Sequence, residues 1–317
     1  MIAEPQASAF PNAFAKYLAA TRPAFLSVTL LGCLIGLASA RFSGVSIDAA
    51  KALLTLFFAL VAHAGVNVVN DYYDALSGAD AGNTARLFPF TGGSRFIQNG
   101  VLTQRETALF GYALLASVIP PGLWLAGHSA AGLLLIGLAG LFIGWAYSAP
   151  PLKLMCRGVG ELAIVAAWLL VTVGSDFVQR GAFAGLPAVA GLPFALLVAN
   201  ILYINQFPDR LGDAGAGKRT LVVRLGPLRA RWGYLVIALL AYGSTVMAII
   251  LGALPGLTAT SLLALPLSLL ATRQLFHDAS QPAELAPAIK LTILAANLFG
   301  LLLAAALTIT ALIGNTP

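Results

Sequence analysis

The chain has 317 residues, of which 59% are hydrophobic and only 9% are charged. Its mean hydropathy is +0.88. A water-soluble domain carries about a quarter charged residues. So few charges cannot cover a water-exposed surface, which excludes an ordinary soluble protein and indicates a polytopic membrane protein.

Nine apolar runs follow one another along the chain, each near the length of about 20 residues that spans a bilayer as a helix. The alternating pattern of a β-barrel is absent, and glycine and proline inside the runs are tolerated by membrane helices. We therefore predict an all-α fold, a polytopic bundle of nine transmembrane helices. The expected spans are residues 24–40, 50–70, 106–126, 130–147, 159–178, 186–206, 232–252, 257–275 and 288–313.

The beginning of the chain differs from a cleaved signal peptide, because Glu4, Pro5 and Lys16 precede the first long apolar run. We expect the first span to be retained, with residues 1–22 forming a short interfacial segment.

The basic residues are distributed unevenly between the two sides of the predicted bundle. Of the 18 Lys and Arg residues, only Arg41, Lys51 and Arg180 fall on one side. The positive-inside rule makes the richer side cytoplasmic, with the N-terminus inside and the C-terminus outside. We expect a bacterial inner-membrane protein whose pI of about 9.5 reflects topology and an anionic ligand, with no nucleic-acid partner.

The first of two long polar segments on the basic side begins with acids at the end of an apolar helix. On a helix, Asn67, Asp71 and Asp74 fall on one stripe, as do Asn70 and Asp74. Asp80 follows six residues later. Acids at membrane depth are costly, which makes them functional candidates.

The second polar segment repeats this arrangement. Asn205, Asp209 and Asp213 recur at every fourth residue and share one face if the helix continues past Pro208. The step from asparagine to aspartate equals that of the first cluster, which we interpret as a weak internal repeat facing one cavity. We predict a single domain over 1–317, with acid-motif halves of about 1–150 and 151–317.

Several carboxylates that face one point repel each other unless positive charge lies between them. Hard oxygen ligands suit Mg²⁺, which bridges to substrate phosphates. The alternative is that the acids are solvated loop residues, helix caps or topology signals, and two matching clusters argue against it. Nearby cations that could neutralise a diphosphate are Arg86, Arg95, Lys153, Arg157, Lys218 and Arg219.

Seven stretches carry a family resemblance. They are residues 21–27, 70–80, 100–103, 147–153, 157–161, 205–213 and 217–226. In these stretches the chain resembles the UbiA superfamily of intramembrane aromatic prenyltransferases. Within it, the chain is most similar to the MenA branch, the 1,4-dihydroxy-2-naphthoate polyprenyltransferases of menaquinone synthesis.

The resemblance implies a nine-helix bundle around a central cavity that opens sideways to lipid, and two Mg²⁺ ions bridging the acid clusters to a polyprenyl diphosphate. It implies catalytic roles for Asp71, Asp74, Asp209 and Asp213, which would also bind metal together with Asp80. The residues expected to bind substrate are Asn67, Asn70, Arg86, Arg95, Tyr147, Lys153, Arg157, Asn205, Lys218 and Arg219.

Two departures from the family pattern bear on the acceptor and the metal. Gly78 stands where many relatives carry a third aspartate. The segment Pro89–Arg95 differs from the expected MenA stretch, and its Thr91-Gly92-Gly93-Ser94 run forms either an anion-binding nest or a turn.

We therefore predict Mg²⁺-dependent transfer of a polyprenyl group to an aromatic acceptor in the bilayer, 1,4-dihydroxy-2-naphthoate being favoured. Alternatives are 4-hydroxybenzoate, homogentisate, a chlorophyllide, another phenol or a lipid head group as acceptor, and terpene cyclisation. A cation-coupled transporter is a more distant alternative, because transporters place charges near the bilayer midplane. No obligate protein partner is expected.

Overall fold

The computed structural model describes residues 3–314, and these fold as helices joined by loops. The long helices are α2 (Ser27–Phe42), α3 (Ala49–Ser77), α5 (Gln104–Ser117), α6 (Ile119–His128), α7 (Gly132–Ser148), α8 (Gly160–Arg180), α9 (Leu186–Gly215), α11 (Pro227–Ile250), α12 (Leu265–Asp278) and α13 (Ala286–Ile313). The short helices are α1 (Ala13–Ala20), α4 (Ala79–Gly82) and α10 (Leu221–Leu225). The 3₁₀ turns are η1 (Ala7–Ala9), η2 (Pro23–Leu26), η3 (Leu154–Cys156), η4 (Gly256–Ala264) and η5 (Pro282–Leu285).

The predicted all-α membrane fold is confirmed. Within residues 3–314, eight helical stretches are long and apolar enough to cross a membrane, and the shorter apolar helix α7 supplies the ninth predicted span. Two helices extend well beyond their predicted ends, because α3 continues to Ser77 and α9 to Gly215. Asp71, Asp74, Asp209 and Asp213 therefore lie near the ends of long helices and not in loops, and Asp80 lies on the short helix α4.

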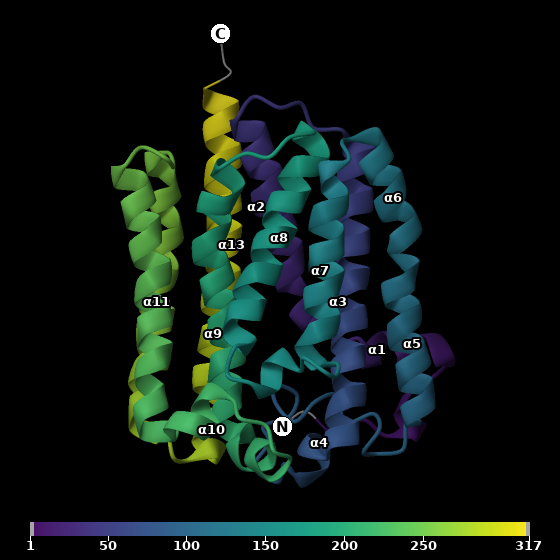
Figure 1. Cartoon of the computed structure of the whole chain (residues 1–317). Helices are drawn as coiled ribbons and strands as arrows, with labels where there is room; N and C mark the ends of the chain where they lie inside the picture. Colours follow the sequence, from purple (N-terminus) through teal and green to yellow (C-terminus); the bar gives the residue numbers. More distant parts are fainter. Residues whose placement is uncertain (1–2, 315–317) are drawn as a thin grey trace.

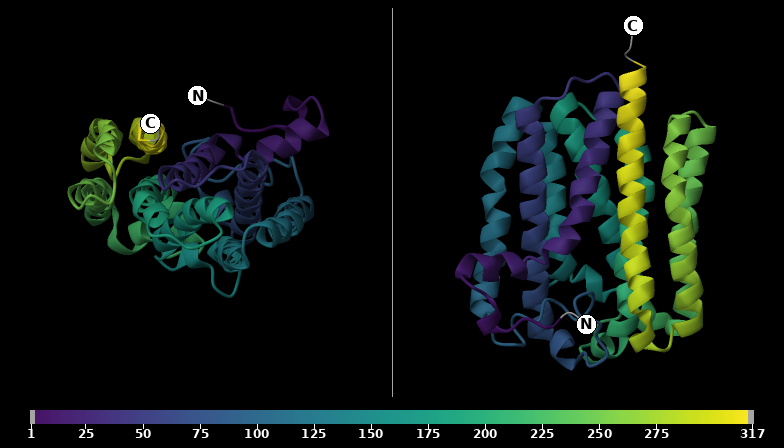
Figure 2. Two further views of the ribbon diagram at one scale, coloured as in Figure 1. Left: turned by 90° about the horizontal axis from the view of Figure 1, so that it is seen from above. Right: turned by 180° about the vertical axis from the view of Figure 1, so that it is seen from behind.

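The long helices run side by side as an upright bundle, and the short helices α1, α4 and α10 gather at one end of it (Figures 1 and 2). The N-terminal region lies at this end, and α13 finishes at the opposite one (Figure 2). Both acid-bearing helices, α3 and α9, also finish at the end with the short helices, so their last turns face a common space.

Helix α9 is the centre of the bundle. In its most apolar stretch 72% of the residues are buried inside the protein, compared with 17% for the stretch spanning α5 and α6. Large side chains such as Phe194, Tyr203 and Phe207 are fully buried along it. Burial on all sides requires an apolar helix surface all round, which the sequence of α9 provides over most of its length. The buried polar side chains Asn200 and Gln206 are hydrogen-bonded, to the carbonyl of Tyr234 and to Glu161.

A glycine sets the close approach of α2 to α8. A Cβ atom at Gly36 would collide with the backbone carbonyl of Thr172 and would lie 2.8 Å from Cβ of Ser175. Small residues at such crossings let membrane helices pack backbone to backbone. The contact fixes α8, whose first turn carries part of the pocket described below.

We expect Gly36→Ala to destabilise the bundle, because the added methyl group must push α2 away from α8. Overpacking of this kind costs about 1–3 kcal/mol, which lowers the midpoint of thermal unfolding in detergent. Gly243→Ala is the matched control, since a Cβ there meets no atom within 4 Å. An unfolding midpoint unchanged in the Gly36 variant would contradict this packing argument.

Candidate functional site

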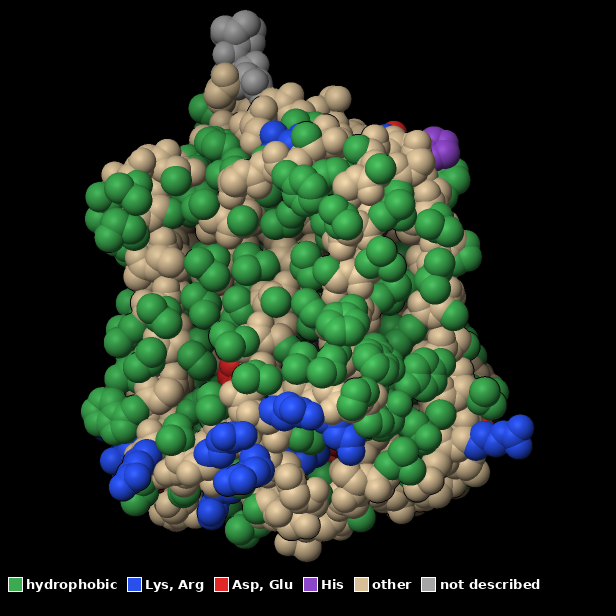
Figure 3. Space-filling view, viewed as in Figure 1, with side chains coloured by type: hydrophobic (Ala, Val, Ile, Leu, Met, Phe, Trp, Pro, Cys, Tyr) green, Lys and Arg blue, Asp and Glu red, His purple; other side chains and the backbone are tan. Residues whose placement is uncertain are grey.

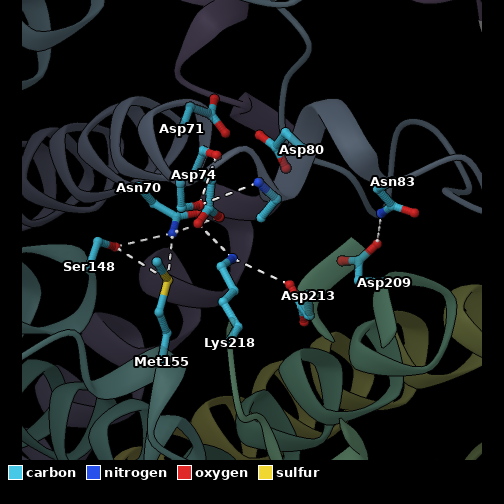
Figure 4. Close-up of polar contacts among 12 residues, drawn as sticks. Asn70, Asp71, Asp74, Asp80, Asn83, Ser148, Met155, Asp209, Asp213 and Lys218 are labelled. Atoms are coloured by element: carbon cyan, nitrogen blue, oxygen red, sulfur yellow. Dashed lines mark hydrogen bonds and ion pairs between the residues drawn. The ribbon is translucent and has the colours of Figure 1, made fainter. Parts of the chain in front are cut away.

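The two acid clusters meet at the end of the bundle, and one lysine lies between them. The Lys218 Nζ atom is 2.6 Å from an oxygen of Asp74 on α3 and 3.4 Å from an oxygen of Asp213 on α9. Figure 4 shows these three side chains pointing toward one another. Segments 139 residues apart in the sequence, at Asp74 and Asp213, are therefore joined through a single cation.

The chain reaches this geometry through a reversal after α3. Gly78 ends the helix with φ of 79°, a left-handed conformation that glycine adopts without strain, and α4 follows directly. The turn folds Asp80 back toward the acids of α3. The left-handed turn at Gly78 thus brings the Asp80 carboxyl group to the same end of the bundle as the acids of α3.

Helix α4 packs tightly against α9. A Cβ atom at Gly212 would lie 2.9 Å from Cβ of Asn83 and 3.0 Å from the carbonyl of Ala79, so only glycine fits there without displacement. The Asn83 side-chain amide donates to Asp209 (Figure 4). These contacts hold the second acid cluster against the segment that carries Asp80.

The glycine run 91–94 covers two of the acids. The Ser94 N–H donates to Asp71 at 3.2 Å, and a Cβ at Gly93 would lie 3.1 Å from Asp71 and collide with Asp80. Gly92 and Gly93 both have positive φ, of 78° and 71°. The run is thus a left-handed turn closed over the acids, and the Ser94 N–H is committed to a carboxylate.

Asn70 connects the first cluster to the loop that follows α7. Its amide donates to Asp74 at 3.3 Å, to the Ser148 hydroxyl at 3.1 Å and to the Met155 sulfur at 3.1 Å (Figure 4). Asn67 instead donates to the backbone carbonyl of Thr21 at 3.1 Å. Asn70 therefore orients the carboxylate of Asp74, whereas Asn67 contacts the N-terminal segment at Thr21.

Two adjoining cavities surround these residues. The polar one has a volume of about 120 Å³ and is lined by four of the predicted acids, Asp74, Asp80, Asp209 and Asp213, with Lys218. Asp71 lies just behind its wall, under the 91–94 turn. The apolar one has a volume of about 530 Å³ and extends into the helix bundle. The side chains that line both are Arg22, Asn70, Tyr147, Leu202 and Asn205.

Arg22 is a site residue that the sequence reasoning missed. Its guanidinium donates to the carbonyl of Phe90 at 3.4 Å and lies 4.6 Å from the centre of the Phe25 ring. Asn205 donates to the same carbonyl, also at 3.4 Å. The signal was present in the Thr21-Arg-Pro stretch, since an arginine beside the first apolar span faces either the membrane surface or an anion.

Five of the predicted substrate-binding cations do not line either cavity. Arg86 is bound to Glu4, with 2.7 Å between its guanidinium and the carboxylate, and Arg95 lies 3.7 Å from the same carboxylate. The bond from Arg86 lowers the pKa of Glu4 below its ordinary value. The remaining three, Lys153, Arg157 and Arg219, are exposed outside the pocket. The roles predicted for these five residues stay predictions.

The polar cavity carries an excess of negative charge. Burial, and after it the charges of Asp74 and Asp71, raise the pKa of Asp80 to about 8, so its carboxyl group holds its proton at neutral pH when no cation is beside it. Burial alone would lower the pKa of Lys218, but Asp74 and Asp213 raise it above its ordinary value. Lys218 therefore stays charged and offsets only part of the repulsion.

The donor set of this cavity fits Mg²⁺. Its ligands would be carboxylate and amide oxygens, the donors that Mg²⁺ prefers, and the Asn205 side-chain oxygen is buried with no hydrogen-bond partner in residues 3–314. In the same residues, no group of three or more His, Cys, Asp or Glu side chains is already placed to hold a metal ion. Lys218 lies between the two clusters, and a divalent cation bound by both clusters would lie beside it.

Comparisons with known proteins identify the family to which the chain is similar. The profile of the UbiA prenyltransferase family matches residues 26–294. A "1,4-dihydroxy-2-naphthoate octaprenyltransferase" of Mycobacterium leprae is 30% identical over 297 residues, covering 93% of this chain and 97% of that protein. One of the same name from Bacillus subtilis is 29% identical over 212 residues, and the alignment covers 65% of this chain and 64% of that protein.

Solved structures share the fold. A UbiA homolog from Archaeoglobus fulgidus, bound to DMAPP and Mg²⁺, superposes with a TM-score of 0.69 at 20% identity, covering 94% of this chain and 99% of that one. A UbiA homolog from Aeropyrum pernix superposes with a TM-score of 0.65 at 17% identity, covering 86% of this chain and 96% of that one.

We expect Lys218→Met to destabilise the protein when divalent cations are chelated, because Asp74 and Asp213 are left facing each other without compensation. Removing one partner of a buried ion pair costs about 3–5 kcal/mol. Mg²⁺ should restore much of the loss in thermal unfolding midpoint. Lys290→Met, at an exposed lysine that forms no ion pair within residues 3–314, is the control. A Lys218→Met variant whose thermal unfolding midpoint changes with neither EDTA nor Mg²⁺ would contradict this role of Lys218.

Proposed function

Because the chain belongs to the UbiA prenyltransferase family and is therefore a prenyltransferase, we propose that it transfers a polyprenyl group from a polyprenyl diphosphate to 1,4-dihydroxy-2-naphthoate. The observation that carries the proposal is the pair of cavities. An acid-lined pocket of about 120 Å³ adjoins an apolar space of about 530 Å³ that suits a hydrocarbon chain and an aromatic ring. The similarity to dihydroxynaphthoate prenyltransferases supports the choice of acceptor.

The polar cavity is the proposed binding site for the diphosphate group. In our proposal Asp71, Asp74 and Asp80 from one half and Asp209 and Asp213 from the other hold two Mg²⁺ ions. When bound, Mg²⁺ neutralises diphosphate oxygens and makes diphosphate a better leaving group. Lys218 would donate to diphosphate oxygens, and Asn70 keeps the Asp74 carboxylate oriented. The loss of diphosphate breaks a C–O bond and leaves an allylic cation.

The apolar cavity protects that cation from water. Its walls include the rings of Phe25, Phe58 and Trp168, which stabilise a cation through their electron-rich faces. Exclusion of water prevents simple hydrolysis of the prenyl group. The electron-rich acceptor ring then forms the new C–C bond, and it regains aromaticity by losing CO₂, whose bonding pair returns to the ring.

Arg22 is the cation best placed for the acceptor carboxylate. It lines both cavities, so its guanidinium can reach an acceptor at the boundary where the two substrates must meet. A planar guanidinium binds a carboxylate through two parallel hydrogen bonds. Tyr147 and Asn205 line the same boundary and complete the proposed acceptor end.

We also propose that the acid pocket lies on the cytoplasmic side of a bacterial inner membrane. Most Lys and Arg side chains visible in Figure 3 gather in a band across the lower part of the molecule, where the short helices lie. Positive charge concentrates on the cytoplasmic side of membrane proteins.

Replacement of Asp74 or Asp213 by asparagine should reduce prenyl transfer by at least a hundredfold, because the amide keeps the volume but loses the charge that holds metal. The measurement is turnover of a labelled prenyl diphosphate by purified protein with Mg²⁺. Asp48→Asn is the control, since Asp48 is an exposed helix cap and asparagine caps equally well. Near-normal turnover in both site variants would overturn the metal assignment.

The acceptor is tested with a panel that includes 1,4-dihydroxy-2-naphthoate and 4-hydroxybenzoate. We expect prenylated, decarboxylated product from the dihydroxynaphthoate. Product from another phenol alone, or a cyclised terpene without any acceptor, would contradict the acceptor while keeping the chemistry. Folded protein that releases no diphosphate with any acceptor, yet drives cation-dependent uptake into liposomes, would favour a transporter.

A further inference from the structure

A second group of cations lies outside the pocket, where the loop after α7 meets the segment around α10. Lys153 and Arg157 belong to the first, and Arg219 and Arg224 to the second; all four side chains are exposed. None of them forms an ion pair with any residue in 3–314. Figure 3 shows Lys and Arg side chains crowded together over this part of the molecule. We name these four residues the basic cluster.

Backbone contacts hold the cluster in shape. The Arg224 guanidinium donates to the carbonyl of Arg219 at 2.8 Å and to that of Arg157 at 2.9 Å. Arg157 in turn donates to the carbonyl of Pro151 at 2.8 Å, and the Arg219 N–H donates to the carbonyl of Cys156 at 2.9 Å. Two loops more than 60 residues apart in the sequence are thus joined. Backbone carbonyls orient the guanidinium groups of Arg157 and Arg224 but do not neutralise them.

The cluster stands at the border of the apolar surface. Leu225, Leu228 and Trp232 follow it along α10 and the start of α11, with exposed fractions of 47%, 59% and 55%. Exposed leucines face acyl chains, and tryptophan is enriched at the level of lipid head groups. Positive charge just beyond such a surface coincides with the depth of phospholipid phosphates.

The cluster is separate from the substrate pocket, since none of its four members lines either cavity. We infer that the basic cluster is a binding site for the phosphate of an anionic phospholipid from the surrounding leaflet. Charge complementarity supports this occupant: several unpaired cations are brought together by the fold, and a polybasic surface at a membrane attracts anionic lipid.

The position of the cluster links lipid binding to the active site. Arg219 directly follows Lys218, the residue between the two acid clusters, and Cys156 directly follows Met155, which contacts Asn70. A lipid phosphate that bridges the two loops steadies the backbone on which Lys218 is mounted. This consequence rests on the proposed function, whereas the binding itself does not.

The test compares lipid binding by purified, delipidated protein in phosphatidylcholine vesicles and in vesicles with equimolar phosphatidylcholine and phosphatidylglycerol. We expect phosphatidylglycerol to raise the thermal unfolding midpoint and to remain bound in native mass spectrometry. Each arginine removed should weaken its binding about fivefold. The variants are Arg219→Gln, whose side chain makes no hydrogen bond within residues 3–314, and the double variant with Arg224→Gln.

Arg105→Gln is the matched control, because Arg105 is a single exposed arginine at the start of α5, away from the cluster. Phosphatidylglycerol binding that is weakened in the cluster variants and unchanged in the control supports the inference. Equal weakening in both would show a general charge effect and overturn it. Displacement of the lipid by inorganic diphosphate would also overturn it, since the cluster would then serve the substrate. If the double variant fails to fold, unaltered binding in Arg219→Gln alone is sufficient to refute the inference.

Discussion

Repulsion among five carboxylates at the end of a membrane bundle is the constraint on which the rest of this structure depends. Asp71, Asp74 and Asp80 come from one half of the chain, and Asp209 and Asp213 from the other. Within residues 3–314, Lys218 is the one cation paired with acids of both groups, at 2.6 Å from Asp74 and 3.4 Å from Asp213. Confinement away from bulk water makes each unpaired charge more costly, so the pocket is built to take up further cations. That shortage of positive charge is what supports the proposal that the pocket holds metal ions and a diphosphate.

The fold places the charged acid pocket beside an apolar cavity, and the two remain distinct. The polar and apolar cavities share a narrow set of lining residues, among them Arg22, Asn70 and Asn205. Their amides and guanidinium are already partly held by backbone carbonyls or by an acid, which fixes their direction before any substrate arrives. A prenyl diphosphate has the same division, with a charged head and an apolar tail, and in our proposal it lies across the boundary with its head in the polar cavity.

Basic residues that look equivalent in the sequence occupy three different environments. Lys218 is buried against acids, Arg86 is paired with Glu4 on the N-terminal segment, and Arg219 faces outward at the membrane border. A basic side chain therefore compensates buried acids, fixes the N-terminal segment or faces lipid head groups, depending on the position of its backbone in the fold. A family of cations around a substrate pocket need not all touch the substrate.

The sequence by itself determined the membrane-spanning helices and the existence of two related acid clusters, because span length and the three- and four-residue spacing of acids are local properties of a helix. It also pointed to Asp80 as the outlying acid. Tertiary structure decided which cations join those acids. Lys218 reaches Asp74 because α9 and α3 end at the same level, and the guanidinium of Arg22 at the boundary contacts the carbonyl of Phe90, 68 residues away in the sequence. Such choices depend on contacts between segments far apart in the chain, which no local spacing records.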